Sequence, residues 1–217
     1  ATSGNVVLNA ETNAASYTDT AANLISAFTG ITSHSGGLTI SDTGGVSAAD
    51  LTKISSLTSG TTTAIATSLI TGSAAEIVSS IGAVSFNPNV PLTITGANVA
   101  TIADLKTINA ATSGTVILNA ATIAADLNGT ALDLAAAFDG IDTSTGDLTI
   151  TGTTPATVAE LIAINAATSG AVSLNAQTIA AAYTDTAANL ISAFTGTTTH
   201  TGGLTVSDVT AVSAADL

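Results

Sequence analysis

The chain has 217 residues, of which 15 are acidic and two are basic, so its formal net charge is −13. This charge excludes nucleic-acid binding, which needs basic groups for the phosphates, and docking on an anionic membrane. No apolar run reaches about 18 residues, so we expect no membrane insertion. Cysteine is absent, which excludes disulfides and thiolate metal sites.

Four Thr-Ser-Gly markers divide the chain into repeats of similar length, beginning at Thr2, Thr58, Thr112 and Thr168. Self-similarity at a fixed period is the signature of a repeat architecture. We therefore predict one repeat array over residues 1–217, whose double-coil repeats span 2–57, 58–111, 112–167 and 168–217. The last repeat stops where the first continues, so we expect the chain to be a section of a longer array.

The first coil of each repeat is predicted to be a short strand, a loop of roughly ten residues and a helix. In the first repeat, Val6 and Leu8 alternate with an outward residue, which is the period of a strand. Leu24, Ile25 and Phe28 then lie at helical spacing and give one apolar stripe. Whether the intervening loop adds a second strand stays open at this point.

The second coil opens with Gly-Leu-Thr-Ile, in which Leu38 and Ile40 are expected to face inward. A helix with Leu51, Ile54 and Leu57 as its apolar stripe follows. The other repeats keep this pattern, so we expect equivalent strands to stack in parallel at about 4.8 Å per coil.

Each predicted helix begins with the pattern Ser/Thr-x-x-Asp/Glu, which is typical of an N-terminal capping box. The hydroxyl accepts from the N–H three residues on, and the acid reaches back to the first N–H and faces the positive end of the helix dipole. Asn23 and Asn189 replace the acid in two copies, which predicts a weaker box. The predicted caps are Thr20, Ser47 with Asp50, Ser73 with Glu76, Thr101 with Asp104, Thr130 with Asp133, Thr157 with Glu160, Thr186, and Ser213 with Asp216.

Consecutive caps lie 26–29 residues apart. This spacing predicts an α/β solenoid, a right-handed parallel stack of about eight strand–loop–short-helix coils that is open at both ends. Right-handedness follows from the strong preference of crossovers between parallel strands. Short helices of this kind are marginal alone, so we expect stacking to hold them.

Two further residue sets occupy equivalent places in several repeats. His34 and His200 lie in equivalent turns, where the other repeats have Pro88 and Ser144, so we expect exposed turn residues without a metal role. Asn9, Asn119 and Asn175 end equivalent strands, and we expect them to form a ladder of side-chain amides along the stack.

Calcium is the one cofactor for which the sequence offers candidate ligands. Calcium takes six to eight oxygen ligands, several of them carboxylates. The acids of the capping boxes are already explained as caps. The better calcium candidates are therefore Asp42, Asp139, Asp142 and Asp147.

The sequence argues against an enzyme. Catalysis needs a non-repeating cluster that contains a nucleophile with a base, or paired acids in a cleft. Near-identical repeats with two Lys, two His and no Arg offer no such cluster.

The whole chain resembles the repeats of very large secreted surface proteins of bacteria, notably cyanobacteria, which are known as beta strand repeat proteins. The residues that carry this resemblance are Leu-Thr-Ile-Ser-Asp at 38–42, Val-Ser-Ala-Ala-Asp-Leu at 46–51 and Leu-Thr-Ser-Gly at 57–60. The resemblance implies a giant extracellular protein of a cell surface, sheath or matrix. The coil is also similar to that of leucine-rich repeats, although the full Leu-x-x-Leu-x-Leu-x-x-Asn line is not present.

These observations predict a non-enzymatic structural protein of an extracellular filament, sheath or surface layer. Its expected partners are other copies of the chain, end to end or side by side, and cell-surface polysaccharide. The alternative is the stalk of a cell-surface adhesin with glycan or calcium-dependent binding. Sugar platforms usually need exposed aromatics, and only Tyr17 and Tyr183 are candidates, which favours the structural protein.

Overall fold

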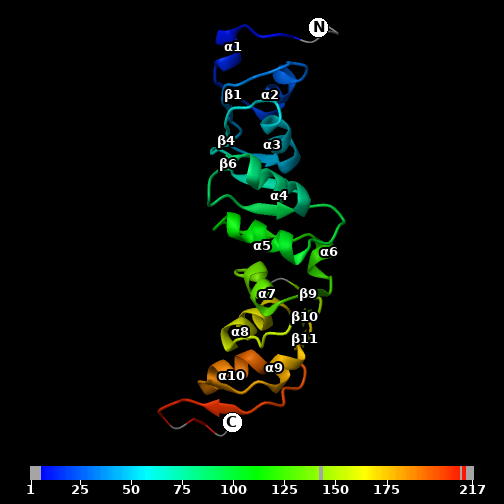
Figure 1. Ribbon diagram of the computed structural model, residues 1–217, viewed down its shortest axis with the longest axis vertical. Coiled ribbons are helices and arrows are strands. Elements are labelled where there is room, and N and C mark those ends of the chain that lie inside the picture. Colours follow the sequence, from blue (N-terminus) through cyan, green and yellow to red (C-terminus); the bar gives the residue numbers. More distant parts are fainter. Residues whose placement is uncertain (1–5, 142–143, 211, 214–217) are drawn as a thin grey trace. The chain divides into compact units, whose positions relative to one another are not determined.

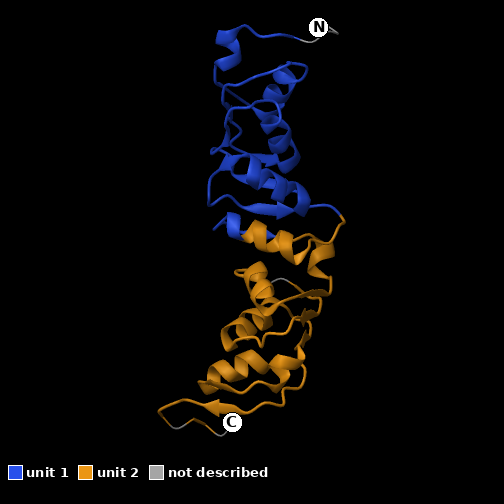
Figure 2. Ribbon diagram, viewed as in Figure 1, with its two compact units in different colours: residues 1–96, 110–117 blue, residues 97–109, 118–217 orange. Residues whose placement is uncertain are grey.

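The computed structural model describes residues 6–141, 144–210 and 212–213. The chain is an α/β protein of short helices and short parallel strands (Figure 1). It divides into two compact units, residues 1–96 with 110–117 and residues 97–109 with 118–217 (Figure 2). Each unit is described by itself below.

The first unit has its helices and strands in close alternation. The helices are α1 (Ala10–Ala14), α2 (Ala21–Phe28), α3 (Ala48–Ser55) and α4 (Ala74–Ala83). The strands are β1 (Tyr17–Asp19), β2 (Leu38–Ile40), β3 (Gly45–Ser47), β4 (Thr62–Ala64), β5 (Leu69–Gly72), β6 (Ser85–Phe86), β7 (Leu92–Ile94) and β8 (Val116–Ile117).

Two parallel sheets interleave along the chain in this unit. Their strand orders are β1-β2-β4-β6 and β3-β5-β7-β8. In the first sheet Tyr17 pairs with Leu38, and Leu38 pairs in turn with Thr62, so paired residues lie 21 and 24 positions apart. In the second sheet Ile70 pairs with Leu92, and Leu92 with Val116, which are 22 and 24 positions apart.

The second unit repeats the plan with fewer paired strands. Its helices are α6 (Ala120–Ile123), α7 (Ala131–Phe138), α8 (Val158–Ala167), α9 (Ala176–Ala180) and α10 (Ala187–Phe194), and α5 (Ile102–Ala111) begins in it. Its strands are β9 (Leu127–Gly129), β10 (Leu148–Ile150), β11 (Val172–Ser173), β12 (Tyr183–Asp185) and β13 (Leu204–Val206). They form two parallel sheets, ordered β11-β10-β9 and β12-β13.

Successive long helices pack side by side within each unit. In the first unit α3 packs against α2 and α4, and in the second α8 packs against α7 and α10. The predicted inward residues form the core between helices and strands. Leu38 and Ile40 of β2 and Leu51 and Ile54 of α3 are buried, and each is at most 1% exposed. In β13 the equivalent Leu204 and Val206 are 48% and 37% exposed, and both line a cleft together with Leu190 of α10.

The strand of the first unit that is equivalent to β13 is β2. β2 is adjacent to α2, and α3 packs against α2 in turn. The corresponding next helix is the one predicted to begin at Ser213, and most of it lies outside the described residues, as does Asp216.

The strand ladders are short and staggered, which differs from one in-register stack of 26–29-residue coils. Paired strands are 21–25 positions apart in the chain, whereas consecutive helix caps are 26–29 apart. Packed helices need about 8–10 Å, but paired strands need only about 4.8 Å. One strand per helix therefore cannot stay paired along a continuous ladder, and each unit has two separate sheets instead.

The loop left open in the sequence contains both a short helix and a second strand. In the first repeat these are α1 and β1, and in the third they are α6 and β9. Sequence periodicity does not reveal them because each is only three to five residues long.

Candidate functional site

Most of the polar side chains predicted to have a structural role belong to the eight expected capping boxes. Six of the predicted residues are helix N-caps in the structure, namely Thr20, Ser47, Ser73, Thr130, Thr157 and Thr186. At the seventh, the Asp104 N–H donates to the Thr101 hydroxyl at 3.1 Å. The helix predicted from Ser213 falls outside the described residues.

Three of the boxes are reciprocal, and the longest of their bonds, from the Thr101 N–H to Asp104 Oδ2, is 3.4 Å. The N–H of Ser73 donates to Glu76 Oε2 at 2.8 Å, and the N–H of Glu76 donates to Ser73 Oγ at 3.3 Å. Thr157 and Glu160 repeat this geometry at 2.8 and 3.2 Å. The backbone hydrogen bond from Ser73 is the main reason that the pKa of Glu76 is lowered, because it stabilises the carboxylate.

Where Asn replaces the acid of the box, a different carboxylate accepts the hydrogen bond from the N–H of the cap residue. Asp19 Oδ1 accepts from the Thr20 N–H at 2.7 Å and from Asn23 Nδ2 at 2.8 Å. These bonds, that of Asn23 first, lower the pKa of Asp19. The N–H of Ala21 donates to Asp42 Oδ2 at 2.6 Å, so a second acid caps α2 from 21 residues away.

The same pair of acids recurs in the fourth repeat. Asp185 Oδ1 accepts from the Thr186 N–H at 2.8 Å and from Asn189 Nδ2 at 2.8 Å. Asp208 Oδ2 accepts from the Ala187 N–H at 2.7 Å. Each of these two helix starts therefore has two carboxylates from outside the box, while the strength of the box itself stays a prediction.

The predicted asparagine residues are caps of helices that the sequence did not reveal. Asn9, Asn119 and Asn175 are the N-caps of α1, α6 and α9. The side-chain amide of Asn175 donates to the carbonyls of Gly152 and Thr154 at 3.1 and 3.0 Å. These contacts to backbone carbonyls differ from the expected amide ladder, because each Asn oxygen is turned to its own helix.

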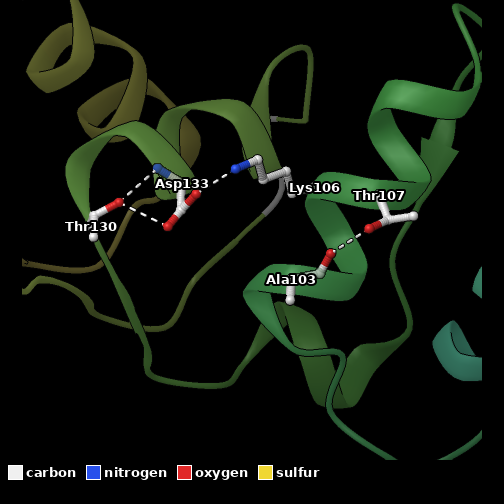
Figure 3. A network of polar contacts seen from close by, with 5 residues as sticks. All are labelled: Ala103, Lys106, Thr107, Thr130 and Asp133. Carbon is white, nitrogen blue, oxygen red and sulfur yellow. Dashed lines mark hydrogen bonds and ion pairs between the residues drawn. The ribbon is translucent and has the colours of Figure 1, made fainter.

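The helices of consecutive coils are joined by side chains on their outer surface. Lys106 Nζ on α5 lies 2.5 Å from Asp133 Oδ1 on α7 (Figure 3). The same carboxylate accepts from the hydroxyl of its cap, Thr130, at 2.9 Å. The hydrogen bond from Lys106 is the largest reason that the pKa of Asp133 is lowered.

Asparagine side chains make a second kind of joint between helices. Asn109 Nδ2 on α5 donates to the carbonyls of Ala136 and Asp139 at 3.1 and 2.9 Å. Asn165 Nδ2 on α8 donates to the carbonyls of Ser192 and Thr195 in the same way. These carbonyls belong to the last turns of α7 and α10, where helix carbonyls lack intrahelical partners.

The Thr-Ser-Gly marker is the joint between one repeat and the next. The Thr58 hydroxyl donates to the Gly36 carbonyl at 2.6 Å and accepts from the Gly60 N–H at 2.9 Å. The Ser59 N–H donates to the His34 carbonyl at 2.9 Å. The markers at 112–114 and 168–170 make the equivalent bonds to Pro88 and Val90 and to Ser144 and Gly146.

The glycines of these turns allow the backbones to approach closely. A Cβ at Gly36 would overlap the carbonyl of Ala15 in the preceding coil, and one at Gly60 would lie 2.6 Å from the Gly36 carbonyl. Neither glycine has a positive φ, so close approach alone requires glycine here.

No protein-family model, no curated protein and no solved structure matches the chain.

The histidines are packed among aromatic rings, and the expectation that both are exposed turn residues is wrong. His34 is 3% exposed, and its ring centroid lies 4.6 Å from that of Phe28 and 5.5 Å from that of Tyr17. In the fourth repeat His200 makes the same contacts with Phe194 and Tyr183. A signal for this cluster is present in the sequence, since Tyr, Phe and His recur together only in these two repeats.

Neither tyrosine is available as an exposed sugar platform. Tyr183 is buried, and its Oη donates to the Ala156 carbonyl at 2.7 Å. Burial raises the pKa of Tyr183. Tyr17 is half-buried, and its Oη donates to the Thr12 carbonyl at 3.3 Å.

The calcium candidates are dispersed among backbone contacts. Asp42 caps α2, and Asp147 Oδ1 accepts from the Ala171 N–H at 2.8 Å. Asp139 is the C-cap of α7, and Asp142 lies outside the described residues. Across the residues that the structure describes, no three His, Asp or Glu side chains gather in a way that could hold a metal ion.

A cleft lined largely by apolar side chains lies on the second unit. It has a volume of about 430 Å³ and is lined by side chains of α10 and β13, including Leu190, Phe194 and Leu204. A cleft of about 380 Å³ in the first unit lies at the ends of α2 and α3 and is lined in part by His34 and Lys53. In the described part of the chain no helix is long and apolar enough to cross a membrane.

Proposed function

We propose that this chain is a non-enzymatic structural section of an extracellular array that forms a filament, sheath or surface layer. In this proposal its short ladders and stacked helices belong to one right-handed solenoid of about eight strand–loop–short-helix coils. Copies of the chain assemble with one another, end to end or side by side.

The observation that carries this proposal is what the repeated side chains are used for. Thr58, Thr112 and Thr168 each donate to a carbonyl of the preceding turn, at 2.6, 2.6 and 2.7 Å. The repeated asparagines and acids bind backbone groups of their own or a neighbouring coil. Recurrent polar groups that bind the chain itself support a mechanical role.

Composition supports an extracellular place for such an array. Two Lys and no Arg leave few sites for trypsin-like proteases, which suits an exposed protein. A net charge of −13 keeps single chains soluble and repels anionic surfaces. Divalent cations and cell-surface polysaccharide are the remaining candidate partners. Either would have to bind at this acidic surface.

Electron microscopy of the purified 217-residue chain, without and with a calcium chelator, tests the proposal. We expect filaments or sheets that lengthen with protein concentration, in either condition. Assemblies that dissolve only under the chelator would show that calcium joins the copies, and matched addition of magnesium is the control. Separate particles at every concentration and calcium level would contradict self-assembly and favour the adhesin stalk.

A further inference from the structure

The first repeat buries one ionisable side chain without a polar partner. His34 is 3% exposed, and among the residues that the structure describes neither its Nδ1 nor its Nε2 has a hydrogen-bond partner. Its ring is held between those of Tyr17 and Phe28. Burial lowers the pKa of His34 below its ordinary value of 6.5, because apolar surroundings disfavour the imidazolium.

The charged and titratable groups around this ring do not stabilise an imidazolium. β1 contributes the Tyr17 phenol, and α3 contributes Lys53, which lines the same cleft. α1, whose Asn13 carbonyl accepts from the Ser35 and Gly36 N–H groups, carries the exposed Glu11. None of the described residues that line the cleft is a carboxylate.

The backbone of the same residue holds two repeats together. The His34 carbonyl accepts from the Ser59 N–H at 2.9 Å and from the Thr58 hydroxyl at 3.3 Å. We propose that protonation of His34 releases its ring from Tyr17 and Phe28 and opens the joint with Thr58 and Ser59, so that the junction of the first two repeats loosens in mildly acidic solution.

The third repeat has the same joint without a titratable ring. Ser144 occupies the equivalent position and is buried, and its carbonyl accepts from the Ser169 N–H at 3.1 Å. His200 in the fourth repeat is partly exposed, and its Nε2 lies 2.9 Å from the Ala181 carbonyl. The buried ring without a partner is therefore specific to His34 among these positions.

Hydrogen exchange of two backbone amides in one sample tests the proposal. Between pH 7.5 and pH 5, after correction for intrinsic rates, we expect the protection factor of the Ser59 amide to fall by up to about tenfold per pH unit below about 6.5. The Ser169 amide should keep its protection. Equal changes at both amides, or a constant protection factor at Ser59, would overturn the proposal.

Two variants separate protonation from a general weakening of the joint. His34→Phe keeps an aromatic ring between Tyr17 and Phe28 but cannot be protonated, so Ser59 protection should become independent of pH. His34→Ser introduces the residue that the chain itself has at 144, and it gives the same test if His34→Phe does not fold. A variant that retains the wild-type pH dependence would also overturn the proposal.

Discussion

At the residue scale, a helix start in this chain is defined by its cap and by the carboxylates around it. Thr157 accepts from the Glu160 N–H, while Glu160 accepts from both the N–H and the hydroxyl of Thr157. Three hydrogen bonds thus close one turn before α8 makes any contact with a neighbour. Because such a helix is short, it has few other hydrogen bonds that could compensate for the loss of its cap.

Thr157→Ala is expected to lower the free energy of unfolding by about 1 kcal/mol, because it removes the acceptor for an N-terminal N–H of α8. For a chain of this size the melting temperature should fall by about 2–4 °C. Thermal unfolding followed by circular dichroism measures the change. Thr154→Ala is the control, since Thr154 is exposed and caps no helix; an equal loss there would contradict the assignment.

Replacing glycine by alanine should change the stability in opposite directions at two positions of the first unit. Gly36 is buried where a Cβ would overlap Ala15, whereas Gly82 lies in α4 with open space around it. Gly36→Ala should therefore destabilise the protein by about 3 kcal/mol, by overpacking. Gly82→Ala should stabilise it by up to about 1 kcal/mol through helix propensity. Chemical denaturation of both variants checks this, and a tolerated Gly36→Ala would contradict the close approach.

At the element scale, much of the fold could be predicted from local pattern. The helices capped by Thr20, Ser47 and Ser73 follow from a cap and an apolar stripe, which are both local features of the sequence. Leu38 and Ile40 could be placed in the core because alternating apolar residues of a strand lie on the same face of the sheet.

What could not be predicted depends on contacts between segments distant in the sequence. α1, α6 and α9 are only four or five residues long, so each Asn cap resembled the end of a strand. The burial of His34 requires Tyr17 and Phe28 to meet it, and the staggered ladders depend on the different spacings of helices and strands. The role of Asp42 as a cap of α2 likewise appears only when two coils are stacked.

The joint between α8 and α10 offers a test of how one helix supports the next. Asn165→Ala removes the donors to the carbonyls of Ser192 and Thr195, which should cost about 1 kcal/mol. The Thr195 N–H closes the last turn of α10 on the Ile191 carbonyl, so its hydrogen-exchange protection should fall about fivefold.

Gln177→Ala is the control for this joint, because Gln177 is an exposed residue of α9 in the same unit. It should leave the protection of the Thr195 amide unchanged. If both variants lower the protection equally, or if Asn165→Ala has no effect, the bond from α8 does not support the end of α10.

At the scale of the whole molecule, two effects of acid oppose each other. The chain carries 15 acids and two Lys, so protonation of carboxylates relieves repulsion and favours the folded state. The same protonation removes cap bonds that are made only by ionised groups. At 0.15 M salt, charges more than about 8 Å apart are largely screened, whereas hydrogen-bonded contacts are not. The loss of cap hydrogen bonds should therefore outweigh the relief of repulsion, and acid should destabilise the folded state.

We expect the melting temperature in 0.15 M salt to fall as the pH drops below about 4.5. The pKa values of Asp19, Glu76 and Asp133 are lowered in the folded state, so their contribution is present above the unfolded-state pKa and is lost as the pH falls through the folded-state pKa. Glu76→Gln keeps an acceptor for the Ser73 N–H but does not titrate, so its pH dependence should be shallower. A melting temperature that rises below pH 4.5 would mean that relief of repulsion outweighs the caps, and an unchanged slope in Glu76→Gln would mean that the Glu76 cap does not contribute to the fall.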